Sequence, residues 1–188
     1  MMLARSLVVT AAIAALTLAT LGAPAAAKPP KWSQKSGSTI VQFAIDASGE
    51  PFDFDSDGED FDILVAALIA TGVVGVFDGT DFTVFAPNDQ AFYDLTGTSN
   101  DTDAFNAVVA LLGVPGVADV LAYHVTRGVR NSRSVVGARK ISMLDGNTIG
   151  YDRALGLIIA NQSAVGLVDT DNRLADGMVH VIDAVLLP

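Results

Sequence analysis

The sequence predicts an α+β domain, with helices in its first half and strands in its second. Apolar residues recur at helical spacing up to about residue 124. After His124, short apolar runs separated by turn signals replace that spacing. Separation of helices from strands along the chain is typical of α+β rather than alternating α/β domains. The length, without an internal repeat, suits one such domain.

Two helices are expected before residue 73. Residues 38–48 favour a helix with Ser38 or Thr39 as its N-cap. In residues 61–72 the apolar side chains fall at i, i+3, i+4 and i+7, which places them on one helix face. Gly72 is positioned to end that second helix.

The next elements are a strand and further helices. Residues 82–86 predict a short strand that Pro87 ends, and Asn88 is placed to cap the helix that follows. Two more short helices are expected on either side of Pro115.

Five strand segments are expected after His124. Two short runs flank Asp145-Gly146-Asn147, which indicates a hairpin. Further strand candidates lie in residues 155–162, 163–171 and 178–188.

The first 27 residues have the pattern of a signal peptide. Arg5 precedes an apolar centre that ends in small residues, which favours cleavage after Ala27. Residues 28–37 are then an exposed lead-in, and residues 38–188 form the domain. The alternative is an uncleaved leader, which would be the only expected contact with a membrane.

Composition excludes several classes of function. The 21 acidic residues outnumber 11 basic ones, which argues against a nucleic acid partner. The absence of cysteine excludes thiol catalysis, iron–sulfur clusters and cysteine-based zinc sites. Gly-x-Ser-x-Gly, His-Glu-x-x-His and phosphate-loop motifs are also absent from the sequence. Both histidines, His124 and His180, lie in apolar sequence. We therefore expect no enzymatic activity.

Three segments carry a family resemblance. "FTVFAPNDQAF" (residues 82–92) resembles the first signature of the fasciclin domain, and "LAYHVTRG" (121–128) resembles its central Tyr-His motif. "DGMVHVIDAVLLP" (176–188) resembles the second signature, although it opens with Asp-Gly where the family usually has Asn-Gly. The resemblance spans about residues 38–188 and implies a wedge-shaped β-sandwich flanked by several helices.

The resemblance also implies a role. Fasciclin domains are typically secreted or surface-attached, act in adhesion and extracellular contact, and are not generally enzymes. The expected location is extracellular or at the cell surface, or periplasmic in a bacterium. The expected partner is a cell-surface or matrix protein or a glycan. The alternative function is binding of a small apolar ligand or a divalent cation, since a few relatives carry pigments.

The resemblance directs attention to Tyr123 and His124. In animal members this region is linked to integrin binding, which makes the pair a candidate partner contact. The other interpretation is a structural pair, because apolar neighbours surround both residues and each side chain needs only one hydrogen bond inside a core.

The acidic stretch "DFDSDGEDFD" (residues 53–62) offers a candidate metal site. Asp53, Asp55 and Asp57, followed by Gly58, match the opening of a helix-loop-helix calcium loop. The twelfth position of such a loop supplies a glutamate, but here it is Leu64, so the standard loop is excluded. Asp60 or Asp62 could replace that glutamate in a shorter, irregular loop. Calcium held by the three aspartates remains the one cofactor hypothesis.

The same stretch also has the pattern of a helix start. Ser56 and Glu59 have capping-box spacing just before an apolar periodic run. Negative charge near a helix N-terminus is also favourable. The sequence leaves both interpretations open.

Overall fold

The computed structural model describes residues 37–49, 54–76 and 80–188. The predicted signal peptide, nearly all of the lead-in and Asp53 lie outside these residues. The helices are α1 (Ile40–Ala47), α2 (Asp62–Thr71), the 3₁₀ turn η1 (Val73–Val76), α3 (Asp89–Thr96), α4 (Asp101–Tyr123) and α5 (Ser132–Gly137). The strands are β1 (Phe82–Pro87), β2 (Val125–Arg127), β3 (Ile141–Ser142), β4 (Thr148–Asp152), β5 (Leu157–Ile159), β6 (Ala164–Val165), β7 (Leu167–Leu174) and β8 (Gly177–Ile182).

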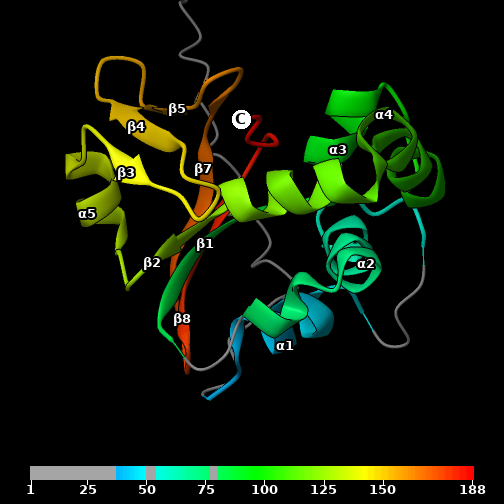
Figure 1. Ribbon diagram of the computed structural model, residues 1–188, viewed down its shortest axis with the longest axis horizontal. Helices are drawn as coiled ribbons and strands as arrows, with labels where there is room; N and C mark the ends of the chain where they lie inside the picture. Colours follow the sequence, from blue (N-terminus) through cyan, green and yellow to red (C-terminus); the bar gives the residue numbers. More distant parts are fainter. Residues whose placement is uncertain (1–36, 50–53, 77–79) are drawn as a thin grey trace, which may run out of the picture.

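Two four-stranded sheets organise the fold (Figure 1). The first has the order β2-β1-β8-β7, and the second has the order β3-β4-β5-β6. β1 and β8 are parallel, with Phe82 opposite Gly177 and Pro87 opposite Ile182, and the other strand pairs are antiparallel. The two family signatures are therefore neighbouring strands at the centre of one sheet.

β1 and β8 are buried along their whole length because both faces of their sheet are covered. Val84 and Val179 face a core built with α1, α2 and α4. Phe85 and Ile182 face a second core, closed by the second sheet and by Val135 of α5. The predicted α+β class and β-sandwich flanked by helices are confirmed.

The local signals for helix ends are confirmed. The Thr39 hydroxyl accepts a hydrogen bond from the amide of Gln42 at 3.2 Å, and the Asn88 side chain accepts from the amide of Ala91 at 3.2 Å. Gly72 ends α2 in the left-handed conformation, with φ of 68°.

The two helices expected around Pro115 form one element, α4, with a break inside it. Gly113 has φ of 66° and ψ of 164°, so the chain leaves helical geometry two residues before the proline. By length and apolar composition alone α4 could span a membrane. The break and its packing against α2 and α3 make it part of the domain.

We predict that Gly177→Ala destabilises the domain, because a Cβ there would collide with the backbone carbonyl of Phe82 and lie 2.8 Å from Cδ1 of Ile40. Neither β1 nor α1 can move without disturbing the central strand pair. The expected loss is about 2–3 kcal/mol in the free energy of unfolding, measured by urea denaturation.

Gly137→Ala is the matched control. A Cβ at this position in α5 meets nothing within 4 Å. Its stability is expected to be unchanged or raised by up to about 1 kcal/mol. Equal losses in the two variants would contradict the packing account.

Candidate functional site

Three helices begin at one place in the fold, and each begins with a buried aspartate. These are Asp62 of α2, Asp89 of α3 and Asp101 of α4, all 0% exposed. Asp55 and Asp60 approach them from the loop before α2. We call these five carboxylates the acidic junction. The positive ends of three helix dipoles meet there, which favours negative charge.

Asp89 joins α3 to the start of α2. Its two carboxyl oxygens accept hydrogen bonds from the amides of Asp62, at 2.8 Å, and Ile63, at 3.1 Å. Its own amide donates to the carbonyl of Asp60 at 3.0 Å. One side chain thus satisfies two amides that helix geometry leaves without partners inside α2.

The capping box predicted at Ser56 and Glu59 is therefore wrong. α2 begins at Asp62, after the N-cap Phe61, whose side chain has no polar atom. Glu59 instead lies in a tight turn, where its amide donates to the Asp57 carboxylate at 3.2 Å. The cap comes from Asp89, which is distant in sequence, so local spacing could not reveal it.

Asp101 holds the other side of the junction. Its carboxylate accepts from the Tyr93 hydroxyl at 2.5 Å and from the amide of Asp55 at 2.6 Å. The amide of Asp101 donates back to the carbonyl of Asp55 at 3.2 Å. The acidic loop is thus bonded to the start of α4 in both directions.

The structure does not bring the three predicted metal ligands together among the residues that it describes. Asp53 lies outside the described residues. Asp57 turns its carboxylate to the amide of Glu59. Asp55 lies with Asp60 and Asp62, and each of these three offers an oxygen within 4.8 Å of the others.

Sequence reasoning considered Asp60 and Asp62 as ligands of an irregular loop, but it missed the contributions of Asp89 and Asp101. A signal for them existed in the distribution of charge. No lysine or arginine occurs between Lys35 and Arg127, and this stretch contains 15 of the 21 acidic residues. Such a stretch offers its acidic side chains no basic partner close in sequence. This pattern favours carboxylates that cluster with one another over carboxylates in ion pairs.

Burial changes the proton affinity of these carboxyls. It raises the pKa of Asp60 to about 6, an effect that a hydrogen bond from Asp89 partly offsets. Burial and the same hydrogen bond raise the pKa of Asp89 well above its usual value. Asp89 is therefore protonated, and its carboxyl group donates a hydrogen bond to Asp60. Burial also raises the pKa of Asp101.

Tyr123 lies inside the domain, where it connects α4 to the second sheet. Its hydroxyl donates to the carbonyl of Thr148 at 3.2 Å and accepts from the amide of Asn161 at 3.2 Å, and its side chain is 0% exposed. The structure therefore uses this tyrosine as an internal link.

His124 ties the C-terminal segment to α4. The amide of Leu186 donates to Nε2 at 3.0 Å, so Nε2 is an acceptor and Nδ1 carries the ring proton toward the carbonyl of Val120 at 2.7 Å. Burial lowers the pKa of His124 to about 4. Both members of the Tyr-His motif are thus interior side chains with complete hydrogen bonding.

His180 is held in the same manner in the central sheet. Its Nδ1 accepts from the amide of Asp171 at 3.2 Å, and its Nε2 lies 2.8 Å from the carbonyl of Arg130. The ring stacks on Phe85 with centroids 5.7 Å apart. Burial lowers its pKa.

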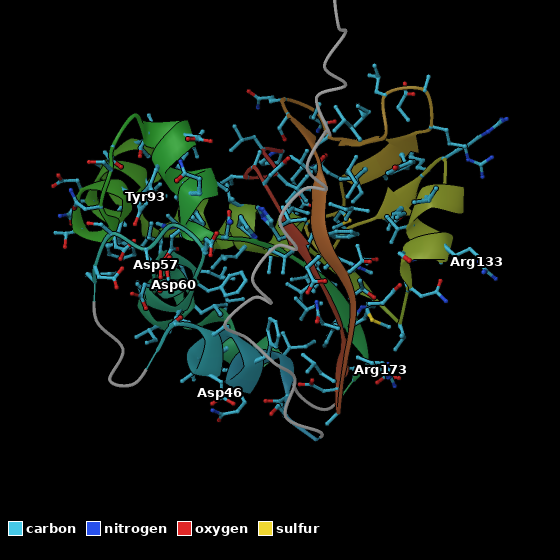
Figure 2. All side chains as sticks on the ribbon, turned by 180° about the vertical axis from the view of Figure 1, so that it is seen from behind. Asp46, Asp57, Asp60, Tyr93, Arg133 and Arg173 are labelled. Atoms are coloured by element: carbon cyan, nitrogen blue, oxygen red, sulfur yellow. The ribbon has the colours of Figure 1, made fainter. Side chains whose placement is uncertain are left out.

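A polar groove lies on the opposite end of the molecule from the acidic junction. It runs between α5 and strands β4 and β5, with a volume of about 450 Å³ and an adjoining part of about 410 Å³. Arg139, Tyr151 and Asp152 line both parts, and the exposed Lys140 and Arg153 flank them. All seven basic residues after Lys35 fall between Arg127 and Arg173, among four acidic residues, and the three bases at the groove outnumber its one acid, Asp152. Figure 2 shows the separation, with Asp57 and Asp60 on the helical side and Arg133 on the strand side.

Comparison with known families identifies the domain. The family model of the fasciclin domain matches residues 59–188. The chain belongs to the fasciclin domain family. Helix α1 precedes the matched residues, yet it is part of this fasciclin fold, because the amide of Ile40 donates to the Asp176 carboxylate at 2.8 Å.

Three related proteins are similar to this fasciclin protein at low sequence identity. Protein sll1483 of Synechocystis sp. is 29% identical over 182 residues, which cover 94% of each chain. Transforming growth factor-beta-induced protein ig-h3 of Sus scrofa is 29% identical over 131 residues, or 68% of this chain and 18% of that protein. A domain pair from the insect cell adhesion molecule Fasciclin I has the same fold, with a TM-score of 0.57, 16% identity, and coverage of 81% of this chain and 52% of that chain.

Family membership supports general statements about location and activity. Proteins with fasciclin domains are typically extracellular or secreted. The family is generally non-enzymatic.

We predict that acid destabilises the domain through His124. The group is neutral in the fold, so its stabilisation is complete above the ordinary histidine pKa near 6.5 and is lost as pH falls toward about 4. The stability difference between the wild type and His124→Gln is expected to shrink by about 3 kcal/mol between pH 7 and pH 4. Urea denaturation at each pH measures that difference.

The comparison with the variant isolates this histidine, because His180 and the acidic junction titrate in both proteins. A stability difference that stays constant with pH would contradict the neutral, buried state of His124.

Proposed function

We propose that this fasciclin protein is an exported, non-enzymatic contact module that binds a protein or glycan at the cell surface or in the extracellular matrix. The observation that carries the proposal is the fasciclin match over most of the chain. The solved neighbour is described as part of a cell adhesion molecule, which supports adhesion as the kind of contact.

The state of the histidines supports a non-enzymatic role. General base catalysis needs a side chain that can reach substrate and change its protonation. His124 and His180 have both ring nitrogens engaged by backbone groups, and both are buried. Neither can act on a bound molecule without breaking contacts that hold the fold.

The interior offers little support for the alternative of a small apolar ligand. Two apolar cavities beside His124 have volumes of only about 30 and 20 Å³. Pockets for small ligands usually measure about 300–1,000 Å³. A pigment or lipid would need the helices to separate from the central sheet.

The polar groove is the surface that best suits a macromolecular contact. It combines exposed Arg139, Lys140 and Arg153 with the ring of Tyr151, and arginine and tyrosine are enriched at the centres of protein interfaces. Its positive charge in an acidic chain favours a partner with carboxylate or sulfate groups.

We predict that the purified chain binds saturably to intact cells or matrix of its source organism, and that Arg139→Glu/Lys140→Glu weakens this binding by about tenfold, or 1.4 kcal/mol. Fluorescent labelling and titration on intact cells measure it. Charge reversal at the groove would replace attraction to an acidic partner by repulsion.

Arg173→Glu is the control, because Arg173 is an exposed arginine of β7 outside the groove (Figure 2). It is expected to bind within about twofold of the wild type, since exposed charges away from the contact contribute little. Absence of saturable binding by the wild type would contradict the proposed function. Equal weakening in both variants would contradict the role of the groove.

A further inference from the structure

The acidic junction contains a buried carboxylate oxygen, on Asp60, that lacks a hydrogen-bond partner in the part of the chain that the structure describes. Asp60 is 5% exposed, and its Oδ1 has no hydrogen-bond partner among the described residues. A buried polar oxygen without a partner is costly, and more so on an ionisable group. The Asp60 carboxylate does accept a hydrogen bond from the neighbouring carboxyl group of Asp89, but this bond leaves Oδ1 without a partner among the described residues. A cation beside this oxygen would satisfy it.

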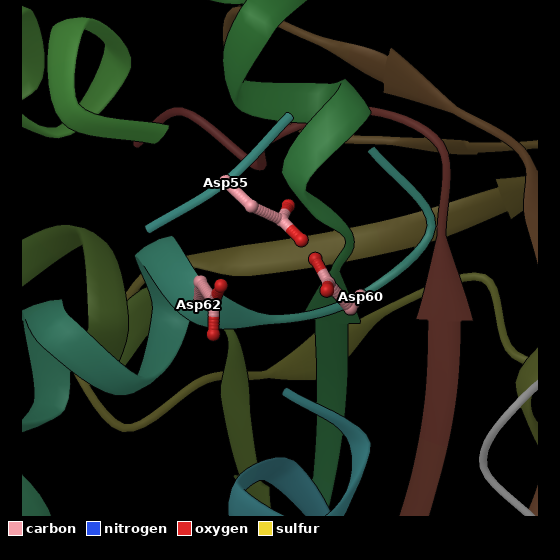
Figure 3. A group of neighbouring side chains, drawn as sticks. All are labelled: Asp55, Asp60 and Asp62. Carbon is pink, nitrogen blue, oxygen red and sulfur yellow. The ribbon is translucent and has the colours of Figure 1, made fainter. Parts of the chain in front are cut away.

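Among the residues that the structure describes, the charged neighbours of Asp60 are carboxylates. Asp55, Asp60 and Asp62 each place an oxygen within 4.8 Å of the other two. Figure 3 shows the carboxylates of Asp55 and Asp60 directed toward one another, with Asp62 beside them at the start of α2. The bases nearest to these aspartates in the sequence are Lys35 and Arg127.

We propose that Asp55, Asp60 and Asp62 bind a calcium ion. Calcium takes six to eight oxygen ligands at about 2.3–2.6 Å, so ligands on opposite sides of one ion lie about 4.6–5.2 Å apart. Oxygens within 4.8 Å of one another therefore fit around a single calcium ion. Magnesium demands a stricter octahedral geometry, whereas calcium tolerates ligands that are irregularly arranged.

Asp89 and Asp101 are positioning residues for this site. Both carboxyl oxygens of Asp89 already accept amides of α2, and this fixes Asp62 relative to Asp60. The Asp101 carboxylate is occupied by Tyr93 and by the amide of Asp55, and this fixes Asp55. The three ligands are thus held by contacts outside the ion's own shell, as is usual for metal sites.

This site differs from the calcium loop suggested by the sequence pattern. Such a loop takes all its ligands from twelve consecutive residues. Its twelfth position here is the buried Leu64, and the carboxylates gather because three helix starts meet. The inference is independent of the proposed contact at the polar groove, since the two sites use different residues.

The test is calorimetric titration of calcium chloride into the purified chain after removal of divalent ions with a chelator. We expect one calcium ion per chain and tighter binding of calcium than of magnesium. The melting temperature should rise by about 5–10 °C when calcium is 100 times its dissociation constant.

The variants locate the ion. Asp60→Asn is expected to weaken calcium binding at least about tenfold, because an amide lacks the negative charge of a carboxylate. Asp94→Asn, on the exposed face of α3, removes the same charge outside the junction and should bind like the wild type. Asp55→Asn is a second ligand variant at an exposed position and should also weaken binding.

Circular dichroism of each variant in chelator shows whether it folds, so loss of binding can be separated from loss of structure. Binding of calcium by folded Asp60→Asn and Asp55→Asn with wild-type affinity would overturn the proposal. Absence of both heat and a melting shift in the wild type at millimolar calcium would overturn it as well.

Discussion

The carboxyl group of Asp89 is the interaction on which the helical half of the domain depends. Asp89 is the first residue of α3. Its carboxyl group accepts hydrogen bonds from the first two amides of α2, those of Asp62 and Ile63, which lie 27 and 26 positions earlier in the chain. Its amide and that of Gln90 also bind carbonyls of the acidic loop. Asp89 comes two residues after the last residue of β1, so its hydrogen bonds connect the end of a central strand to α2 and the acidic loop. The acidic junction is the consequence of bringing three helix starts to that point.

The two ends of the molecule have opposite electrostatic characters. The helical end contains buried carboxylates and has no basic residue in the long stretch from Lys35 to Arg127, whereas the strand end contains every base after that stretch. A buried set of acids needs protons or a cation, and an exposed set of bases attracts an acidic partner. The fold thus provides two candidate binding places. Tyr123 and His124 lie inside the domain and hold its parts together.

Much of the fold could be predicted from local sequence, because its signals act over a few residues. Thr39, Asn88 and Gly72 mark helix ends by chemistry that involves only their neighbours. The prediction of a capping box at Ser56 and Glu59 was wrong because the cap of α2 is not local. It comes from Asp89, which is distant in sequence. The acidic stretch drew attention to Asp55, which lies in the acidic junction. Its neighbours Asp60 and Asp62 belong to the same stretch, whereas Asp89 and Asp101 could be identified only when the helix starts were placed in space.

The central claim is that Asp89 holds α2 and the acidic loop in place. The most direct measurement is urea denaturation, in chelator, of Asp89→Ala and of Asp94→Ala on the exposed face of the same helix. The raised pKa keeps Asp89 neutral in the ion-free protein, so its removal relieves little repulsion and leaves two buried amides without acceptors. A loss of about 2–4 kcal/mol in the free energy of unfolding is predicted for Asp89→Ala, against less than about 0.5 kcal/mol for Asp94→Ala. Equal, small losses in the two variants would contradict the account.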